Sequence, residues 1–413
     1  MKARYSGLSS YCYQVSYLGL IEASVVNFNS LLRTMNQNTF LSLYKKLLGL
    51  FTLVLLFSGC QTISREPSNS SLESLSSWPQ LSRSKWQNLN ASNLYELLTN
   101  HSVDAQDSQG NTGLFYAAEL NSDPKVFLGL IEHGADRTHT NVEGLTALHI
   151  GAAMNQNTQV VEILIESPQL LKVVDQWGRD PASFAILANN SFPVISTILH
   201  AEQFETINNS QERPWPQLSP QVWEAMDVTD LERFLSQGKS PSQRSPNGRT
   251  GLHFAALHSK NPALIRAMID RGFSVEARDS RRWTPGITAA VMNSNLPVTQ
   301  LFYELGSSFE TSNPLNHSVL HFSAIMNPNP QIIAFLVSIL QTLDPVSTAG
   351  VTPLMAAAWA AQQDSGIIGL LQHGANVHQK DNQGRDILDL LQKNPSMSQT
   401  EGYWLLMDKY FSR

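Results

Sequence analysis

A unit of about 34 residues recurs along most of this chain and is clearest from Asn247 to Asp279. Thr250 can cap a first helix with its hydroxyl, because the leading amides of a helix have no partner inside it. Pro262 suits the first turn of a second helix, where no amide donor is needed, and Gly272 can end that helix in a left-handed conformation. The pattern predicts a helix–turn–helix unit, and its repetition restricts the chain to a stack of such units.

The register of the repeat can be followed through most of the sequence. Positions spaced by one repeat hold turn residues, namely Gly110, Gly144, Gly178, Gly248, Arg282, Asn316, Gly350 and Gly384. Two residues after each stands a side chain that can cap a helix: Thr112, Thr146, Asp180, Thr250, Thr284, Ser318, Thr352 and Asp386. We therefore expect the first helix of every regular repeat to begin at one of these capping residues.

The repeats resemble ankyrin repeats, whose pattern joins a turn, Thr-Pro-Leu-His-x-Ala, two helices and a Gly. Parts of that pattern stand at Thr146–His149, Thr250–His253, Val319–His321 and Thr352–Leu354. A tetratricopeptide array has a similar period, but its Trp, Gly-Tyr and Pro signature is not found in register. The resemblance covers roughly residues 86–411 and implies an all-α solenoid of stacked helix–turn–helix units with short turn or hairpin tips.

The array contains a long internal duplication. Trp78–Ser82 returns as Trp215–Ser219 with the same five residues, about four repeats later. We expect a first block at 78–201, with a cap and three repeats, a seam at 202–214, and a second block at 215–413, with a cap and five repeats. One continuous stack with a flaw at the seam and two separate blocks both fit this pattern.

The chain before the array resembles a bacterial lipoprotein leader. Lys45 and Lys46 precede a mostly apolar run at 47–57, which is too short to span a bilayer but suits a signal peptide. Phe57–Cys60 resembles a lipobox, which implies lipidation of Cys60. We expect a mis-assigned start and disorder at 1–34, a signal peptide at 35–59 and a Ser-rich tether at 60–77. The alternative is that Cys60 is a buried thiol at the end of an apolar helix.

Charge and cysteine content restrict the classes of partner and the cellular compartment that can be expected. Removing residues 1–59 takes away five basic residues and one acidic residue, so the formal net charge of -6 becomes -10. An acidic chain disfavours nucleic acid, whose phosphates need a basic surface. The other cysteine, Cys12, lies in the removed part, so no disulfide is expected. Because Gln61 rather than Asp follows Cys60, the resemblance implies the outer membrane facing the periplasm.

No catalytic constellation stands out in the sequence. His149, His253 and His321 share one repeat position, where the family resemblance implies a structural hydrogen bond to the neighbouring turn. Catalysis would need a local group of base, nucleophile and orienting residue. No metal-ligand spacing, phosphate-binding loop or nucleophile elbow is found. The sequence therefore predicts no enzyme, no metal and no cofactor.

Binding of another protein is the better supported function. In ankyrin-like stacks the turn tips and one side of the first helices line a concave face. Counted by register, the candidates on that face are Trp177, Arg179, Arg281, Arg282, Trp283, Met292, Met326 and Trp359. Trp and Arg are favoured interface anchors and Met adapts to irregular surfaces, although the same residues could instead fill contacts between repeats. We expect an envelope-anchored interaction module, such as an inhibitor or immunity-type binder; the alternative is a passive structural lipoprotein of the envelope.

Overall fold

The capping residues and prolines of the repeats define the helix boundaries. The computed structural model describes residues 79–203, 218–311 and 313–412, all within one contact unit at Ser74–Arg413. The expected signal peptide, tether and lipidation site at Cys60, and all but the first two residues of the expected seam, lie outside these residues. Apart from an isolated bridge between Arg244 and Thr250, the described residues form helices, turns and irregular segments and no strand, which confirms the all-α prediction.

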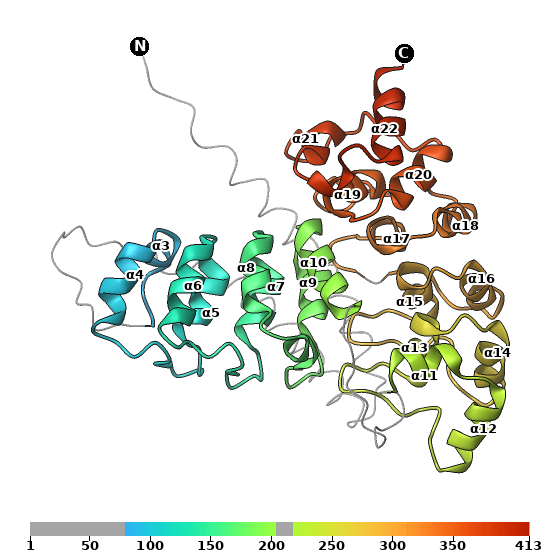
Figure 1. Ribbon diagram of the computed structural model, residues 1–413, viewed down its shortest axis with the longest axis horizontal. Coiled ribbons are helices and arrows are strands. Elements are labelled where there is room, and N and C mark those ends of the chain that lie inside the picture. Colours follow the sequence, from blue (N-terminus) through green and yellow to red (C-terminus); the bar gives the residue numbers. More distant parts are fainter. Residues whose placement is uncertain (1–78, 204–217, 312, 413) are drawn as a thin grey trace, which may run out of the picture. The chain divides into compact units, whose positions relative to one another are not determined.

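The first block contains four pairs of helices, labelled in Figure 1. They are α3 (Arg83–Gln87) and α4 (Ala91–Leu98), α5 (Gly113–Leu120) and α6 (Pro124–Glu132), α7 (Ala147–Met154) and α8 (Thr158–Leu164), and α9 (Pro181–Ala188) and α10 (Phe192–Gln203). A 3-10 helix, η2 (Pro168–Lys172), joins the third pair to the fourth. Helix α10 includes Glu202 and Gln203, the first two residues of the expected seam.

The described part of the second block contains six pairs of helices, which are labelled in Figure 1. They are α11 (Pro220–Ala225) and α12 (Val228–Ser236), α13 (Gly251–His258) and α14 (Pro262–Asp270), α15 (Pro285–Met292) and α16 (Leu296–Glu304), α17 (Val319–Met326) and α18 (Pro330–Leu340), α19 (Pro353–Ala360) and α20 (Ser365–Gln372), and α21 (Ile387–Leu391) and α22 (Glu401–Phe411). A 3-10 helix, η3 (Pro395–Met397), connects the last two helices.

Each helix pair stacks on its neighbours in the same way. The first helices form one row of contacts, from α5 to α7 to α9 and from α13 to α15, α17, α19 and α21. The second helices form another row, as α4, α6, α8 and α10 do. All eight predicted capping residues stand at the N-cap of a first helix. The core lies between the two rows, where residues such as Leu114, Val126 and Leu252 are fully buried.

A ladder of buried asparagines ties most of the repeats to the one before, and Ser259 and Ala361 stand at the equivalent positions after α13 and α19. Asn155, at the end of α7, donates through Nδ2 to the carbonyls of Ala118 (3.2 Å) and Asn121 (2.8 Å), and its Oδ1 accepts from the amide of Asn157 (3.0 Å). Equivalent residues are Asn121, Asn189, Asn293, Asn327 and Asn394. The ladder satisfies carbonyls at helix ends that would otherwise lack partners.

The turn tips follow the same repeat. Amide to carbonyl bonds link successive tips, for example Gln176 to Glu143 (2.9 Å) and Ser280 to Asn247 (3.0 Å). Gly178 and five other glycines adopt positive φ at the tips, whereas Arg282 at the same position adopts a φ of 65°. A side chain in this left-handed region is strained, so this tip is less favourable than its glycine counterparts.

Candidate functional site

The last repeat of the first block contacts the second block through a junction. We use this name for the contacts of α9 and α10 with the second block. α11 packs on α13, whereas α10 packs on α17 and α19. Phe192 of α10 lies 4.7 Å from the ring centroid of His317 and stacks on His321 at 5.6 Å. Ser196 of α10 donates to the carbonyl of Ala360 at 2.8 Å. The first block therefore contacts the second block through helices that are far from it in the sequence, α17 and α19.

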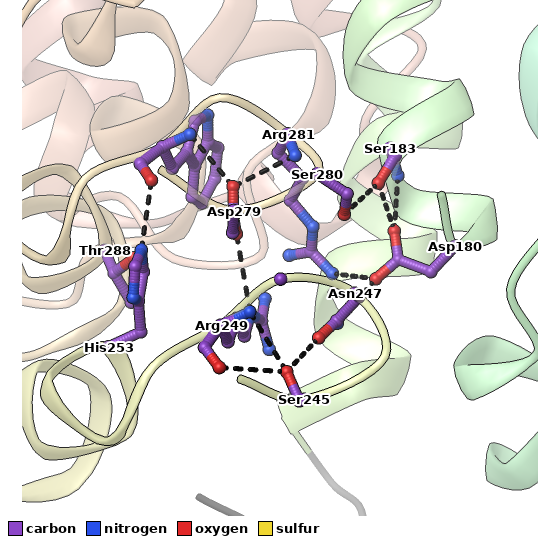
Figure 2. A network of polar contacts seen from close by, with 12 residues as sticks. Asp180, Ser183, Ser245, Asn247, Arg249, His253, Asp279, Ser280, Arg281 and Thr288 are labelled. Carbon is purple, nitrogen blue, oxygen red and sulfur yellow. Dashed lines mark hydrogen bonds and ion pairs between the residues drawn. The ribbon is translucent and has the colours of Figure 1, made fainter. Parts of the chain in front are cut away.

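Turn tips of the second block form the other half of the junction. Asn247 donates through Nδ2 to Oδ2 of Asp180 at 2.9 Å, and the hydroxyls of Ser280 and Ser183 are 2.8 Å apart. Asn313 donates to the carbonyl of Ile186 at 2.6 Å. Figure 2 shows the tips that carry Asn247 and Ser280 meeting the helix that carries Asp180 and Ser183. These tips pack against the first block.

A buried cluster of charged side chains lies at the centre of the junction (Figure 2). Arg281 donates through Nη2 to Asp180 at 3.0 Å and also pairs with Glu202. Arg249 lies 3.6 Å from Asp279 and 3.8 Å from Glu202. We call these five residues the latch cluster. With all of them ionised, three carboxylates face two guanidinium groups, which leaves one excess negative charge in a buried place.

Burial and pairing act against each other in this cluster. Burial opposes the ionisation of Asp180, but the charges of Arg281 and Arg249 outweigh it and lower the pKa of its carboxyl. Burial also disfavours the Arg281 cation, yet Asp180 and Glu202 raise the pKa of its guanidinium. For Asp279 burial prevails and raises the pKa. Asp180 and Arg281 therefore form the firmly ionised pair of the cluster.

A groove runs beside the latch cluster along the second block. Its volume is about 490 Å³. The first block contributes Leu171, Lys172 and Glu202 to its walls, and the second block contributes Phe254 and Leu257 of α13 together with Met292, Met326 and Arg249. The groove thus combines flexible apolar side chains with charged ones, which suits a peptide segment or another mixed surface.

Three residues that we expected on an exposed binding face are buried. Arg281 is 2% exposed, Trp283 1% and Met326 3%. Arg281 is covered by the first block, and the Trp283 ring packs 5.3 Å from that of Phe322. The expectation that Arg281 and Trp283 lie exposed on a binding face is therefore wrong, and Met326 contributes only to the wall of the groove.

The other expected binding residues keep exposed or half-buried surface. Trp177 is 40% exposed, and the Arg179 guanidinium lies 4.8 Å from its ring centroid. Asp175 holds Arg179 at 2.6 Å, so the Trp–Arg pair is fixed before any partner arrives. Arg282 and Met292 are half-buried. Whether they bind a partner stays a prediction.

Trp359 is half-buried beside the junction. The Arg385 guanidinium lies 4.6 Å from its ring centroid, and Phe192 of α10 lies 6.5 Å away. Asp381 pairs with Arg385 at 2.6 Å. Phe192 of the first block therefore already contacts the Trp359 ring. Binding of a partner by Trp359 stays a prediction.

The repeated histidines have the structural role that the resemblance implied. The ring nitrogen Nδ1 of His253 accepts from the amide of Thr250 at 3.1 Å, so Nε2 carries the proton and donates to the carbonyl of Trp283 at 3.1 Å. Burial lowers the pKa of His253 to about 3, which keeps the ring neutral at pH 7. His149 and His321 make the equivalent bonds to the next tip.

In the described ranges, no three His, Cys, Asp or Glu side chains are grouped as ligands for a metal ion. Nor does any helix within these ranges combine the length and hydropathy that crossing a membrane requires.

No sequence motif indicates the junction. The repeat pattern identifies Asp180 as a helix cap, but its pairing with Arg281 joins residues about 100 apart that share no motif. Arg249, Asp279 and Glu202 carry no local signal that sets them apart from solvent-exposed charges. The asparagine ladder did carry a signal, since Asn121, Asn155 and Asn189 are spaced by one repeat.

Paired helices, hydrogen-bonded tips and stacked first helices define a helical-repeat protein. Family comparison agrees, because residues 114–209 match the description "Ankyrin repeats (3 copies)" and residues 349–382 match "Ankyrin repeat". The chain is an ankyrin-repeat protein. These repeats indicate a protein–protein interaction module, and proteins of the family are typically binding modules rather than enzymes.

Curated relatives share the repeats over part of their length. Human SH3 and multiple ankyrin repeat domains protein 2 is 26% identical over 191 residues, which are 46% of this chain and 10% of that protein. L-asparaginase of Dirofilaria immitis is 27% identical over 172 residues, which are 42% of this chain and 28% of that protein. The chain thus spans well under a third of either relative.

Two solved structures align with about half of this chain. One is a chain from the complex of a predatory endopeptidase and an immunity protein of Bdellovibrio bacteriovorus, with 18% identity, a TM-score of 0.38 and coverage of 47% of this chain and 99% of that chain. Another is an ankyrin repeat domain from Acinetobacter baumannii, with 20% identity, a TM-score of 0.34 and coverage of 46% and 95%.

Proposed function

We propose that this chain is a lipid-anchored envelope protein that binds another envelope protein and performs no catalysis itself. The Trp177–Arg179 pair supports this proposal most directly. An indole ring with 40% exposure, held by a guanidinium that is itself held by Asp175, is a rigid anchor of the kind found at interface hot spots. Met292, which is half-buried at the groove, offers a second, adaptable contact.

The proposed binding of a partner is tested by replacing two exposed tryptophans, one in the proposed anchor and one elsewhere. Full-length chain is captured from detergent-solubilised envelope, and co-purified proteins are quantified for wild type, Trp177→Ala and Trp404→Ala. Trp404 is 61% exposed on α22 and serves as the control. We expect one stoichiometric partner, retained by Trp404→Ala and weakened by more than about tenfold in Trp177→Ala, as loss of an anchor implies. Absence of any stoichiometric partner would favour the passive structural lipoprotein.

The anchor proposal is supported by the run from Lys45 to Cys60 and concerns residues that the structure does not describe. Cells fed a clickable palmitate should label wild type and Cys12→Ala, but not Cys60→Ala. Labelled protein should fractionate with the outer membrane. Equal labelling of Cys60→Ala would remove the anchor from the proposal, and inner-membrane fractionation would change the compartment. The nature of the partner, whether an enzyme to inhibit or a toxin to neutralise, is then read from the captured protein.

A further inference from the structure

The junction differs in chemistry from the contacts between successive repeats. Repeats within a block meet through apolar side chains and through the asparagine ladder. In that ladder the side-chain amide of Asn155, for example, donates to two carbonyls of the preceding repeat. The junction instead brings together five charged side chains, the Ser183–Ser280 pair and a few apolar groups such as Phe192. Polar contacts of this kind are typical of interfaces between domains that separate and rejoin.

Most buried polar atoms that lack a hydrogen-bond partner in the described residues belong to this junction. They include Oε2 of Glu202, Nε and Nη2 of Arg249, Oδ2 of Asp279, Nε and Nη1 of Arg281, and both ring nitrogens of His317. Oε2 of Glu202, Oδ2 of Asp279 and Nε and Nη2 of Arg249 meet as ion pairs at 3.6 and 3.8 Å, which are too long for hydrogen bonds. A buried polar atom without a hydrogen bond is costly, and the same atom in water is not. Separation of the two blocks would expose atoms of Glu202, Arg281 and His317 to water and offset part of the contacts that it breaks.

We propose that the last repeat of the first block, α9 and α10, is a movable arm that leaves the second block when the latch cluster breaks. Arg281 is the centre of the latch because it contacts both Asp180 and Glu202 of the arm from a tip of the second block. Phe192 and Ser196 leave α17 and α19 in the same movement.

Movement of the arm would also reshape the groove. Leu171, Lys172 and Glu202 form its wall on the first block, while Met292 and Met326 lie on the second. Glu202 belongs to the arm, whereas Leu171 and Lys172 lie in η2, which packs against α9 and α10. Movement of the arm together with η2 would therefore change the width of the groove, and a partner that fits only one width would shift the balance between the open and closed states. This last step rests on the proposed function, whereas the movement itself is tested without a partner.

The test compares two buried serines. Ser196 lies in the junction, and Ser323 lies between α15 and α17 inside the second block. Each is at most 3% exposed and donates to a helix carbonyl, Ala360 at 2.8 Å for Ser196 and Ala290 at 3.0 Å for Ser323. Each is changed to Cys in the full chain with Cys12 and Cys60 replaced by Ser, and its reaction rate with a thiol reagent is measured under native conditions.

We expect Ser196→Cys to react about tenfold or more faster than Ser323→Cys, because the arm opens without unfolding of the second block. Adding Arg281→Met should raise the rate at position 196 about tenfold and leave position 323 unchanged. Arg282→Ala, one residue away, is the matched control and should change neither rate.

A disulfide across the junction keeps the test decisive if Arg281→Met does not fold. The hydroxyls of Ser183 and Ser280 are 2.8 Å apart, so Ser183→Cys and Ser280→Cys can be joined by oxidation. The oxidised pair should slow the reaction of Ser196→Cys about tenfold, with recovery on reduction. Equal rates at positions 196 and 323, or a rate at 196 that the disulfide leaves unchanged, would overturn the movable arm. Neither result depends on whether a partner is captured.

Discussion

Replacement of Asn155 tests whether the asparagine ladder or apolar burial holds the repeats together. Asn155 is 5% exposed and makes three hydrogen bonds, two to carbonyls of the preceding repeat and one to the amide of Asn157. Asn155→Ala leaves these three groups without their partner. Each orphaned buried group costs roughly 1–3 kcal/mol, and relaxation and water recover part of this, so we expect a loss of about 2–4 kcal/mol in the free energy of unfolding.

Asn155→Asp separates shape from hydrogen bonding. The carboxylate has the same size as the amide but cannot donate, and it places a negative charge beside two carbonyl oxygens. We therefore expect Asn155→Asp to be at least as destabilising as Asn155→Ala at neutral pH. Gln156→Ala, at the exposed neighbouring position, should stay within about 0.5 kcal/mol of wild type.

Urea unfolding followed by circular dichroism at 222 nm measures all three variants. Because a repeat array can unfold in steps, the comparison uses the first transition as well as the last. If Asn155→Ala falls within about 0.5 kcal/mol of Gln156→Ala, the ladder contributes little and the stack depends on apolar packing alone.

Three further predictions concern single residues and use the same unfolding measurement. Arg282→Gly should stabilise the chain by about 1 kcal/mol by relieving a φ of 65°; a loss of stability would contradict the assigned strain. Trp283→Ala should cost about 3–5 kcal/mol because the ring is 1% exposed, whereas Trp177→Ala should stay within about 0.5 kcal/mol; equal costs would refute the assigned burial. Burial lowers the pKa of His317 from an ordinary 6.5 to about 3. The neutral buried ring therefore makes its full contribution to the free energy of unfolding above pH 6.5, and this contribution is lost as the pH falls towards 3. Melting temperatures at pH 7.5 and pH 5 should therefore differ less for His317→Gln than for wild type, and an equal difference would exclude this group.

The features that the sequence predicted well are those set by neighbours within one repeat. Thr250 stands at the N-cap of its helix, Pro262 begins the next helix and Gly272 follows the end of that helix with a positive φ, as the sequence predicted. The hydroxyl of Thr250 contacts Nδ1 of His253 at 3.0 Å rather than a helix amide. His253 could likewise be assigned to a bond with the next tip, since the repeat itself brings position 283 to it.

Burial of the tips could not be predicted, because the repeat does not determine it. Trp177 and Arg281 occupy the same position in their repeats, one residue before the tip residue. Trp177 is 40% exposed and Arg281 is 2% exposed. The difference arises from the first block lying against the second, which brings Asp180 to Arg281 across about 100 residues of chain. Periodicity is identical at both positions and carries no information on such a contact.

The junction also limits how this array can grow or shrink in evolution. A repeat gained or lost between α5 and α8 moves only the far end of the first block and leaves α9 and α10 in place against the second. A repeat inserted after α10 would instead separate Asp180 and Glu202 from Arg281 and present a new pair of helices to α17 and α19. Homologous chains should therefore vary in length within the first block and keep a fixed number of repeats from α9 to α19.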